Sequence, residues 1–130
     1  MKTKKSIVTS SDVFFLEGFP YSQAIRVGNF LFISGIVPED REGILVGEED
    51  IVMQAIQIFE NMKKILSAAE LEMKDVIKIN MYFKNIEDLK KILEVRRKYF
   101  SKPYPCSTGV EVSRLLKNNW LLEIEAIASD

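Results

Sequence analysis

The residues of this chain that could do chemistry are carboxylates, hydroxyls and one thiol, because the sequence contains no histidine. Histidine is the usual general base near neutral pH and the commonest metal ligand. A hydrolytic reaction would therefore depend on carboxylates, hydroxyls, the thiol, backbone groups or bound water. The single cysteine excludes an intramolecular disulfide and a multi-cysteine zinc cage. No metal site and no cofactor are expected.

Three candidate polar residues follow one another directly after a proline. The hydroxyls of Ser107 and Thr108 can donate hydrogen bonds to a polar ligand, or they can satisfy nearby backbone groups. Cys106 would be a nucleophile only if a basic neighbour lowered its pKa, and no histidine is available for that. We therefore expect Cys106 to be a small structural thiol.

The other ionisable candidates occur in segments with ordinary structural explanations. Glu123 alternates with apolar residues, which describes any half-exposed strand as well as a catalytic one. Arg96, Arg97 and Lys98 are expected to form a solvated face of a helix, and an RNA contact there has no other support.

The length and the net charge of the chain indicate how many domains it has and which kinds of binding partner are disfavoured. The 130 residues predict a single domain that spans 1–130. The 18 basic and 19 acidic residues nearly cancel, whereas a general nucleic-acid binder usually carries a basic excess. The basic N-terminus is not followed by the apolar core of a signal peptide, and no apolar run approaches the length of a membrane span. We therefore expect a cytoplasmic protein with no membrane partner.

The first half of the chain reads as strands followed by a helix. The apolar run 13–16 is expected to form the first strand. Residues 24–27 and 30–33 flank Gly28-Asn29, which is a strong hairpin signal. Residues 50–69 carry apolar side chains with a 3.6-residue period, which predicts an amphipathic helix.

The second half predicts a strand, a second helix and two more strands. Residues 76–83 and 121–128 alternate between apolar and polar side chains. Asn85 can cap a helix that ends before Pro103, and residues 110–112 are a short strand. The fold class is thus α+β, with order β-β-β-α-β-α-β-β, a mostly antiparallel sheet and both helices on one face.

Three segments resemble the Rid/YjgF family of reactive intermediate deaminases, some members of which are called endoribonuclease L-PSP or translation initiation inhibitors. The first is Gly18-Phe19-Pro20-Tyr21-Ser22-Gln23-Ala24, with one residue inserted, and it continues through Ser34-Gly35-Ile36. The others are Gly109-Val110-Glu111-Val112-Ser113-Arg114-Leu115 and Glu123-Ile124-Glu125-Ala126-Ile127-Ala128. The resemblance extends over nearly the whole chain, with the helices in the expected places.

The resemblance implies a chorismate-mutase-like (YjgF-type) fold and a homotrimer, in which the sheets form a central barrel and small molecules bind in clefts between subunits. It also implies metal-free hydrolysis of enamines and imines. In such a cleft an arginine holds the substrate carboxylate, a tyrosine lines the pocket, and a glutamate positions water with a backbone carbonyl. Tyr21 matches the tyrosine and Glu123 the glutamate.

Three family positions depart from the pattern. Ser107 stands at the position of the arginine, Leu93 at that of an asparagine and Ile36 at that of a glutamine. The expected cleft residues are Tyr21, Ser34, Gly35, Ile36, Leu93, Ser107, Thr108 and Glu123. Such a cleft would be more apolar and without its fixed positive charge, and Arg114 is too far along the sequence to be expected to replace it.

Three functions remain open on this basis. The first is a homotrimer that binds a small metabolite and is not a standard 2-imino acid deaminase. The second is a deaminase or hydrolase that acts on a different imine or enamine through Glu123 and water. The third is a ribonuclease or translation inhibitor, which the neutral charge and the lack of an aromatic and basic stripe disfavour.

Overall fold

A computed structural model of the protein describes residues 3–130. Six strands form one sheet in the order β1-β2-β3-β6-β4-β5. The strands are β1 (Lys5–Val8), β2 (Ala24–Val27), β3 (Phe30–Ile36), β4 (Val76–Phe83), β5 (Cys106–Glu111) and β6 (Leu122–Ser129). Every pairing is antiparallel except that of β4 with β5. The predicted mostly antiparallel sheet is confirmed.

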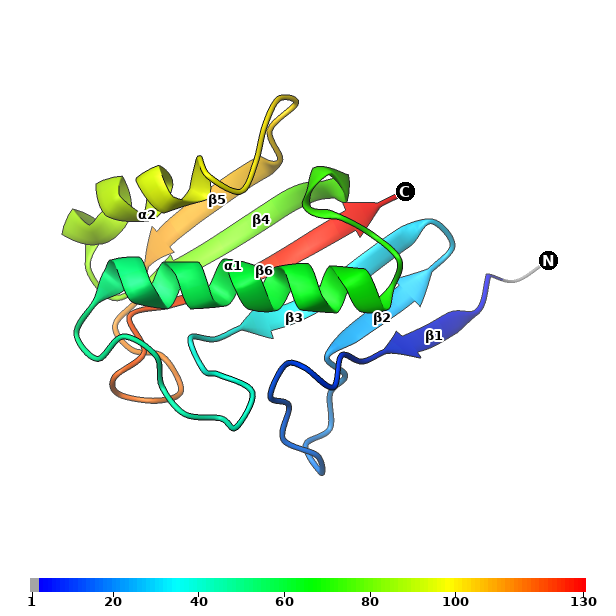
Figure 1. Cartoon of the computed structure of the whole chain (residues 1–130), viewed down its shortest axis with the longest axis horizontal. Coiled ribbons are helices and arrows are strands. Elements are labelled where there is room, and N and C mark those ends of the chain that lie inside the picture. The colour runs from blue at the N-terminus through cyan, green and yellow to red at the C-terminus, as the bar shows by residue number, and fades with distance from the viewer. Residues whose placement is uncertain (1–2) are drawn as a thin grey trace.

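Both helices lie on the same face of this sheet, as predicted (Figure 1). Helix α1 (Ile51–Ala68) crosses the centre, and α2 (Leu89–Arg96) lies near β4 and β5. Asp50 caps α1 by accepting a hydrogen bond from the Met53 amide at 3.1 Å. Short 3-10 turns, Met73–Asp75 and Ile86–Asp88, precede β4 and α2, and Asn85 caps the second turn rather than α2 itself. None of the described helices is long and apolar enough to cross a membrane.

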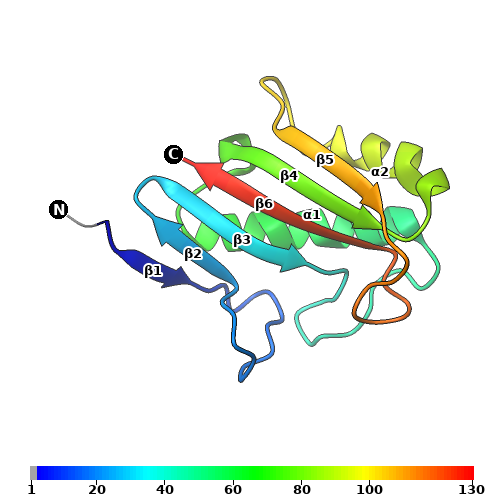
Figure 2. The same cartoon turned by 180° about the vertical axis from the view of Figure 1, so that it is seen from behind.

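The core lies between the helices and the sheet. The apolar stripe of α1 is buried against alternate residues of β3, β4 and β6. This follows from the periods of 3.6 residues in the helix and two residues in the strands, which place apolar side chains on one face of each element. Phe59, Phe83 and Ile124 are each 0% exposed at its centre. The opposite face of the sheet carries no helix among residues 3–130 (Figure 2). That open face bears Phe32, Asn80 and Glu125.

Two predicted elements are wrong. The first strand is Lys5–Val8, not residues 13–16, because β1 pairs with β2 through its backbone and needs no apolar side chains at the sheet edge. Residues 13–16 instead form a loop. The fifth strand begins at Cys106, so Ser107 and Thr108 belong to a strand and not to a loop.

Candidate functional site

Glu123 lies on β6 with its side chain on the open face of the sheet, between the buried Leu122 and Ile124. Its carboxylate lies over Gly35 of β3, where a Cβ atom would overlap it. The register of β3 and β6 shifts between Ile33 and Ile36, at this same point. Gly35 is therefore required for the carboxylate to approach the β3 backbone this closely.

A second carboxylate on the same strand is held by hydrogen bonds. Glu125 Oε1 accepts from the Asn80 side-chain amide at 3.0 Å and from the Tyr82 hydroxyl at 2.7 Å. This bond to Glu125 is the main reason why the pKa of Tyr82 is raised. Burial, and then the negative charge of Glu125, raise the pKa of Glu123. The direction of this shift makes Glu123 easier to protonate than an ordinary carboxyl group.

A pocket of about 490 Å³ opens beside Glu123. It contains five of the eight residues expected at the cleft, and these are Tyr21, Ser34, Gly35, Ile36 and Glu123. The Ser34 hydroxyl donates to the Ser22 carbonyl oxygen at 2.6 Å and so fixes the turn that carries Tyr21. The Ile36 side chain is 3% exposed and serves mainly the core.

Aromatic residues of the loop before β2 form one wall of this pocket. Tyr21 is 54% exposed and packs edge-on against Phe15, with 5.2 Å between ring centroids, and it also lies near Phe19. Gln23, 4% exposed, ties the loop to β2 by accepting from the Ser10 amide at 2.6 Å. The apolar run that was predicted to be a strand therefore forms part of the pocket instead.

The other wall comes from the segment before β6. Lys117 forms an ion pair with the buried Glu39 at 2.6 Å and lies over the Trp120 ring. Trp120 is 5% exposed, and its indole nitrogen has no hydrogen-bond partner among residues 3–130. Sequence reasoning missed this wall, although Trp120 is the only tryptophan of the chain.

The three remaining expected residues lie elsewhere on this chain. Ser107 pairs with Ile79 and faces the helices, whereas Glu123 pairs with Tyr82 and faces away from them. Two strand spacings and a three-residue offset put Ser107 and Glu123 about 14 Å apart. Thr108 is on the open face of β5, and Leu93 is 36% exposed on α2. One chain alone therefore does not bring the two groups together.

Ser107 has a partner that the sequence did not indicate. Nη1 of Arg96, in the last turn of α2, donates to the Ser107 hydroxyl oxygen at 2.6 Å. Arg96 is partly buried, and this burial lowers its pKa. The expectation of a fully solvated face is thus wrong for Arg96, whereas Arg97 and Lys98 are exposed as expected.

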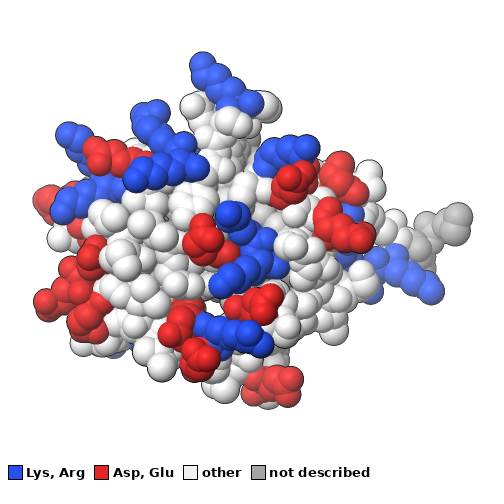
Figure 3. All heavy atoms as spheres, in the orientation of Figure 1, with Lys and Arg blue, Asp and Glu red and all other residues white. Residues whose placement is uncertain are grey.

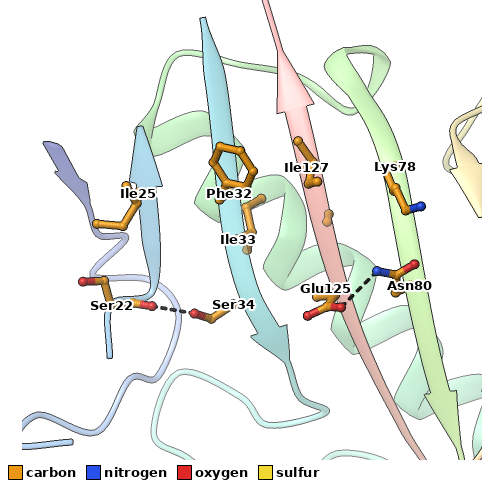
Figure 4. A pocket seen from close by; sticks show the side chains of 10 residues that line it. Ser22, Ile25, Phe32, Ile33, Ser34, Lys78, Asn80, Glu125 and Ile127 are labelled. Atoms are coloured by element: carbon orange, nitrogen blue, oxygen red, sulfur yellow. Dashed lines mark hydrogen bonds between the residues drawn. The ribbon is translucent and has the colours of Figure 1, made fainter. Parts of the chain in front are cut away.

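The open face itself is hollowed between β2, β3, β4 and β6 (Figure 4). This depression of about 380 Å³ is lined by Phe32, Ile127, Lys78, Asn80 and Glu125, among others. Residues 3–130 contain no group of three or more carboxylate or thiol side chains placed to hold a metal ion. The ionisable residues found here fit proton transfer and hydrogen bonding to a small organic molecule.

Comparisons with known proteins agree with the fold. The family model described as Endoribonuclease L-PSP matches residues 17–130. A RutC family protein of Pyrococcus horikoshii is 49% identical over 84% of this chain and 86% of its own. A 2-iminobutanoate/2-iminopropanoate deaminase of Dermatophagoides farinae is 36% identical over 83% and 84%. The crystal structure of E. coli TdcF with bound serine has a TM-score of 0.87 and 33% identity, over 96% and 98%.

Proposed function

Because this chain belongs to the Rid/YjgF family, whose model is described as Endoribonuclease L-PSP, we propose that it forms a homotrimer with a small metabolite bound in each cleft between subunits. The observation that carries the proposal is the division of the expected cleft residues into two groups. Five line the pocket beside Glu123, and three lie on β5 and α2. A site built from both groups requires two copies of the chain.

The open face of the sheet supports self-association. Ile7 is 71% exposed, and Phe30 and Phe32 are each 46% exposed on this face. Apolar patches of this kind on a folded chain are typical of interaction surfaces. All six residues of β5, at the sheet edge, are exposed as well. Covering an unpaired edge strand is one of the ways in which proteins protect it.

The reaction depends on what β5 offers to the substrate. A 2-imino acid carries a carboxylate, and the β5 position that would bind it through a guanidinium is Ser107. A hydrogen bond to a charged group contributes about 1.5–3 kcal/mol. Losing one or two such bonds corresponds to a rate at low substrate that is lower by a factor of about 10 to roughly 20,000. We therefore propose a metabolite-binding protein that is not a standard 2-imino acid deaminase.

A deaminase or hydrolase with a different imine or enamine substrate is the second candidate. It is favoured by the raised pKa of Glu123 and by the close approach of its carboxylate to Gly35. A carboxylate with a pKa nearer to neutrality can take a proton from water and return it to a leaving amine. The relative that is named an iminobutanoate deaminase supports the same reaction class.

A ribonuclease or translation inhibitor, the third candidate, is disfavoured by the surface. Basic and acidic side chains are interspersed over the helix-covered face, and no continuous basic stripe crosses it (Figure 3). Proteins that bind RNA through its backbone need such a basic surface.

Sedimentation velocity tests the assembly. We expect a trimer at micromolar concentration, and we expect Phe32→Glu to dissociate it because the substitution places a charge on the open face. Val52→Glu is the matched control, since Val52 is 37% exposed on α1, on the opposite face of the sheet. A monomeric wild type, or a Phe32→Glu variant that remains a trimer, contradicts the proposed interface.

An imine assay tests the reaction. An amino-acid oxidase generates a 2-imino acid, and the remaining imine is followed with and without the protein. We expect no acceleration over the background. An acceleration that Glu123→Gln abolishes would replace the first candidate by the second.

A further inference from the structure

We propose that the pocket beside Glu123 takes an uncharged aromatic ligand with a hydrogen-bond acceptor, and that the indole N–H of Trp120 donates to that acceptor. This inference rests on the proposed metabolite-binding function and names the chemical class of the metabolite. Trp120 lines the pocket and is 5% exposed. Its Nε1 is the one buried side-chain nitrogen or oxygen atom without a hydrogen-bond partner among residues 3–130, and this is the observation that carries the inference.

Other buried amide side chains of the same pocket wall are satisfied within the chain. Gln23 accepts from the Ser10 amide at 2.6 Å. Asn61 donates to the carbonyl oxygens of Val37 at 3.2 Å and Glu39 at 2.9 Å. An indole has one donor and no acceptor, so only an acceptor can satisfy it. A buried donor without a partner is unfavourable, and a ligand that brings an acceptor to it removes that cost.

The charges of the pocket wall disfavour an anion. Lys117 is the one cation that lines the pocket within residues 3–130, and its Nζ forms an ion pair with Glu39 at 2.6 Å. The remaining ionisable groups of the wall include the carboxylates of Glu123 and Glu125. Three carboxylates against one paired lysine repel a carboxylate ligand.

A cation does not fit the free donor either. An ammonium group has three N–H donors and no acceptor, so it cannot satisfy the indole nitrogen. The ring of Trp120 already has the Lys117 ammonium 5.5 Å from its centroid, and a second cation there would be repelled. An uncharged acceptor, such as a carbonyl oxygen, is the group that both the donor and the charges allow.

The opposite wall of the pocket indicates an aromatic ligand. The rings of Phe15 and Tyr21 pack edge-on with 5.2 Å between their centroids, and Phe19 lies 6.1 Å from Tyr21. Phe19 is 50% exposed and Tyr21 is 54% exposed, so each presents ring surface that this chain does not cover. Aromatic rings pack favourably on one another in edge-on and offset arrangements. The volume of about 490 Å³ is that of a site for a small organic molecule.

Probes that share a phenyl ring and differ in one group test this assignment. Acetophenone carries an uncharged carbonyl, ethylbenzene lacks it, benzoylformate adds a carboxylate, and 1-phenylethylamine carries an ammonium group. Because the chain has a single tryptophan, the one indole ¹H–¹⁵N NMR signal of the full-length protein reports Trp120. Calorimetry measures the affinities. We expect acetophenone to move the indole signal downfield and to bind about 5-fold more tightly than ethylbenzene, and we expect both charged probes to bind more weakly than acetophenone.

Trp120→Phe keeps a ring and removes the N–H donor. It should weaken acetophenone binding by about 5-fold and leave ethylbenzene binding unchanged, because only acetophenone uses the donor. Tyr104→Phe is the matched control, because Tyr104 is 52% exposed and lies outside the pocket lining, and its affinity for both probes should equal that of the wild type. The wild-type indole signal needs no substitution, so the test remains decisive if Trp120→Phe does not fold.

The outcomes separate this inference from the proposed function. An indole signal that acetophenone does not move means that an internal water molecule, and not a ligand, satisfies the donor, and it overturns the inference even if the protein is a trimer. Equal affinity for acetophenone and ethylbenzene, or tighter binding of either charged probe, overturns the ligand class. If acetophenone binds through Trp120 in a protein that sediments as a monomer or hydrolyses 2-imino acids, the inference stands and the proposed function is wrong.

Discussion

Gln54 offers the sharpest test of how the fold positions Glu123. It lies in the first turn of α1 and is 0% exposed. Its amide nitrogen donates to the carbonyl oxygens of Gly47 at 2.9 Å and Asn119 at 3.0 Å. Its side-chain oxygen accepts from the Leu121 amide at 2.7 Å. One side chain therefore ties the helix to the segment that leads into β6 and Glu123.

Gln54→Met removes these three hydrogen bonds while keeping the length of the side chain. A buried backbone group that loses its partner costs about 1–3 kcal/mol. Gly47 is partly buried and Asn119 is exposed, so water can replace part of what they lose. Leu121 is also partly buried, and it lies next to the buried Trp120 in the chain. We therefore expect the free energy of unfolding to fall by roughly 3 kcal/mol.

Gln57→Met is the matched control, because Gln57 lies on the same helix and its side chain makes one hydrogen bond, to Asn61 at 2.8 Å. Both variants are unfolded in urea at equal protomer concentration and followed by circular dichroism. The fluorescence of Trp120, the only tryptophan, reports the neighbouring segment and should shift to the red in Gln54→Met alone. A stability within 1 kcal/mol of the control, with unchanged fluorescence, would refute the role of Gln54.

Three further predictions concern the site and its titration. Gly35→Ala should displace the Glu123 carboxylate and return the raised pKa of Glu123 toward the ordinary value. A ¹³C NMR titration of the Glu123 carboxyl group measures this pKa. An unchanged pKa would contradict the packing of Glu123 on Gly35. Because the pKa of Glu123 is raised on folding, its contribution to stability is present below the unfolded value of 4.5 and is lost as the pH rises through the folded value. Glu123→Gln should therefore be more stable than the wild type at pH 8 and equal to it at pH 3.5. Denaturant unfolding at both pH values measures this difference, and a variant that is less stable than the wild type at pH 8 would contradict the prediction. Burial, with a hydrogen bond to Glu60, raises the pKa of Tyr99 to about 12. Tyr99→Phe should therefore remove the tyrosine absorbance change that occurs at the highest pH in an alkaline titration. If that absorbance change persists in the variant, another tyrosine is responsible for it.

The elements of this fold could largely be predicted from local sequence patterns. The 3.6-residue period of α1 and the alternation in β4 and β6 are set by which side chains must be buried, and each is visible within a short window. The hairpin at Gly28, where φ is +58°, follows from the conformational freedom of glycine. The segment 13–16 misled because an apolar run shows only that burial is required, and these residues are used in a pocket wall instead.

Part of the pocket lining could be predicted, because the residues Tyr21, Ser34, Gly35, Ile36 and Glu123 fall within two of the three recognisable segments. A sequence signal for Gln54 also existed, since a polar residue interrupts the apolar stripe of α1 at a buried position. What the sequence indicated about each of these residues was its place on an element, and not its partner.

The contacts that give the site its chemistry were decided only by the tertiary structure. Gly35 and Glu123 are far apart in the chain and meet because β3 and β6 are neighbours in the sheet. In the sequence, Arg96 is one of three consecutive basic residues. In the structure it is a partly buried hydrogen-bond donor, because the parallel pairing of β5 with β4 places the Ser107 side chain on the side of the sheet where α2 lies. The physical reason is that periodicity records whether a side chain faces the core or the solvent, whereas pairing between distant strands determines which polar groups share that environment.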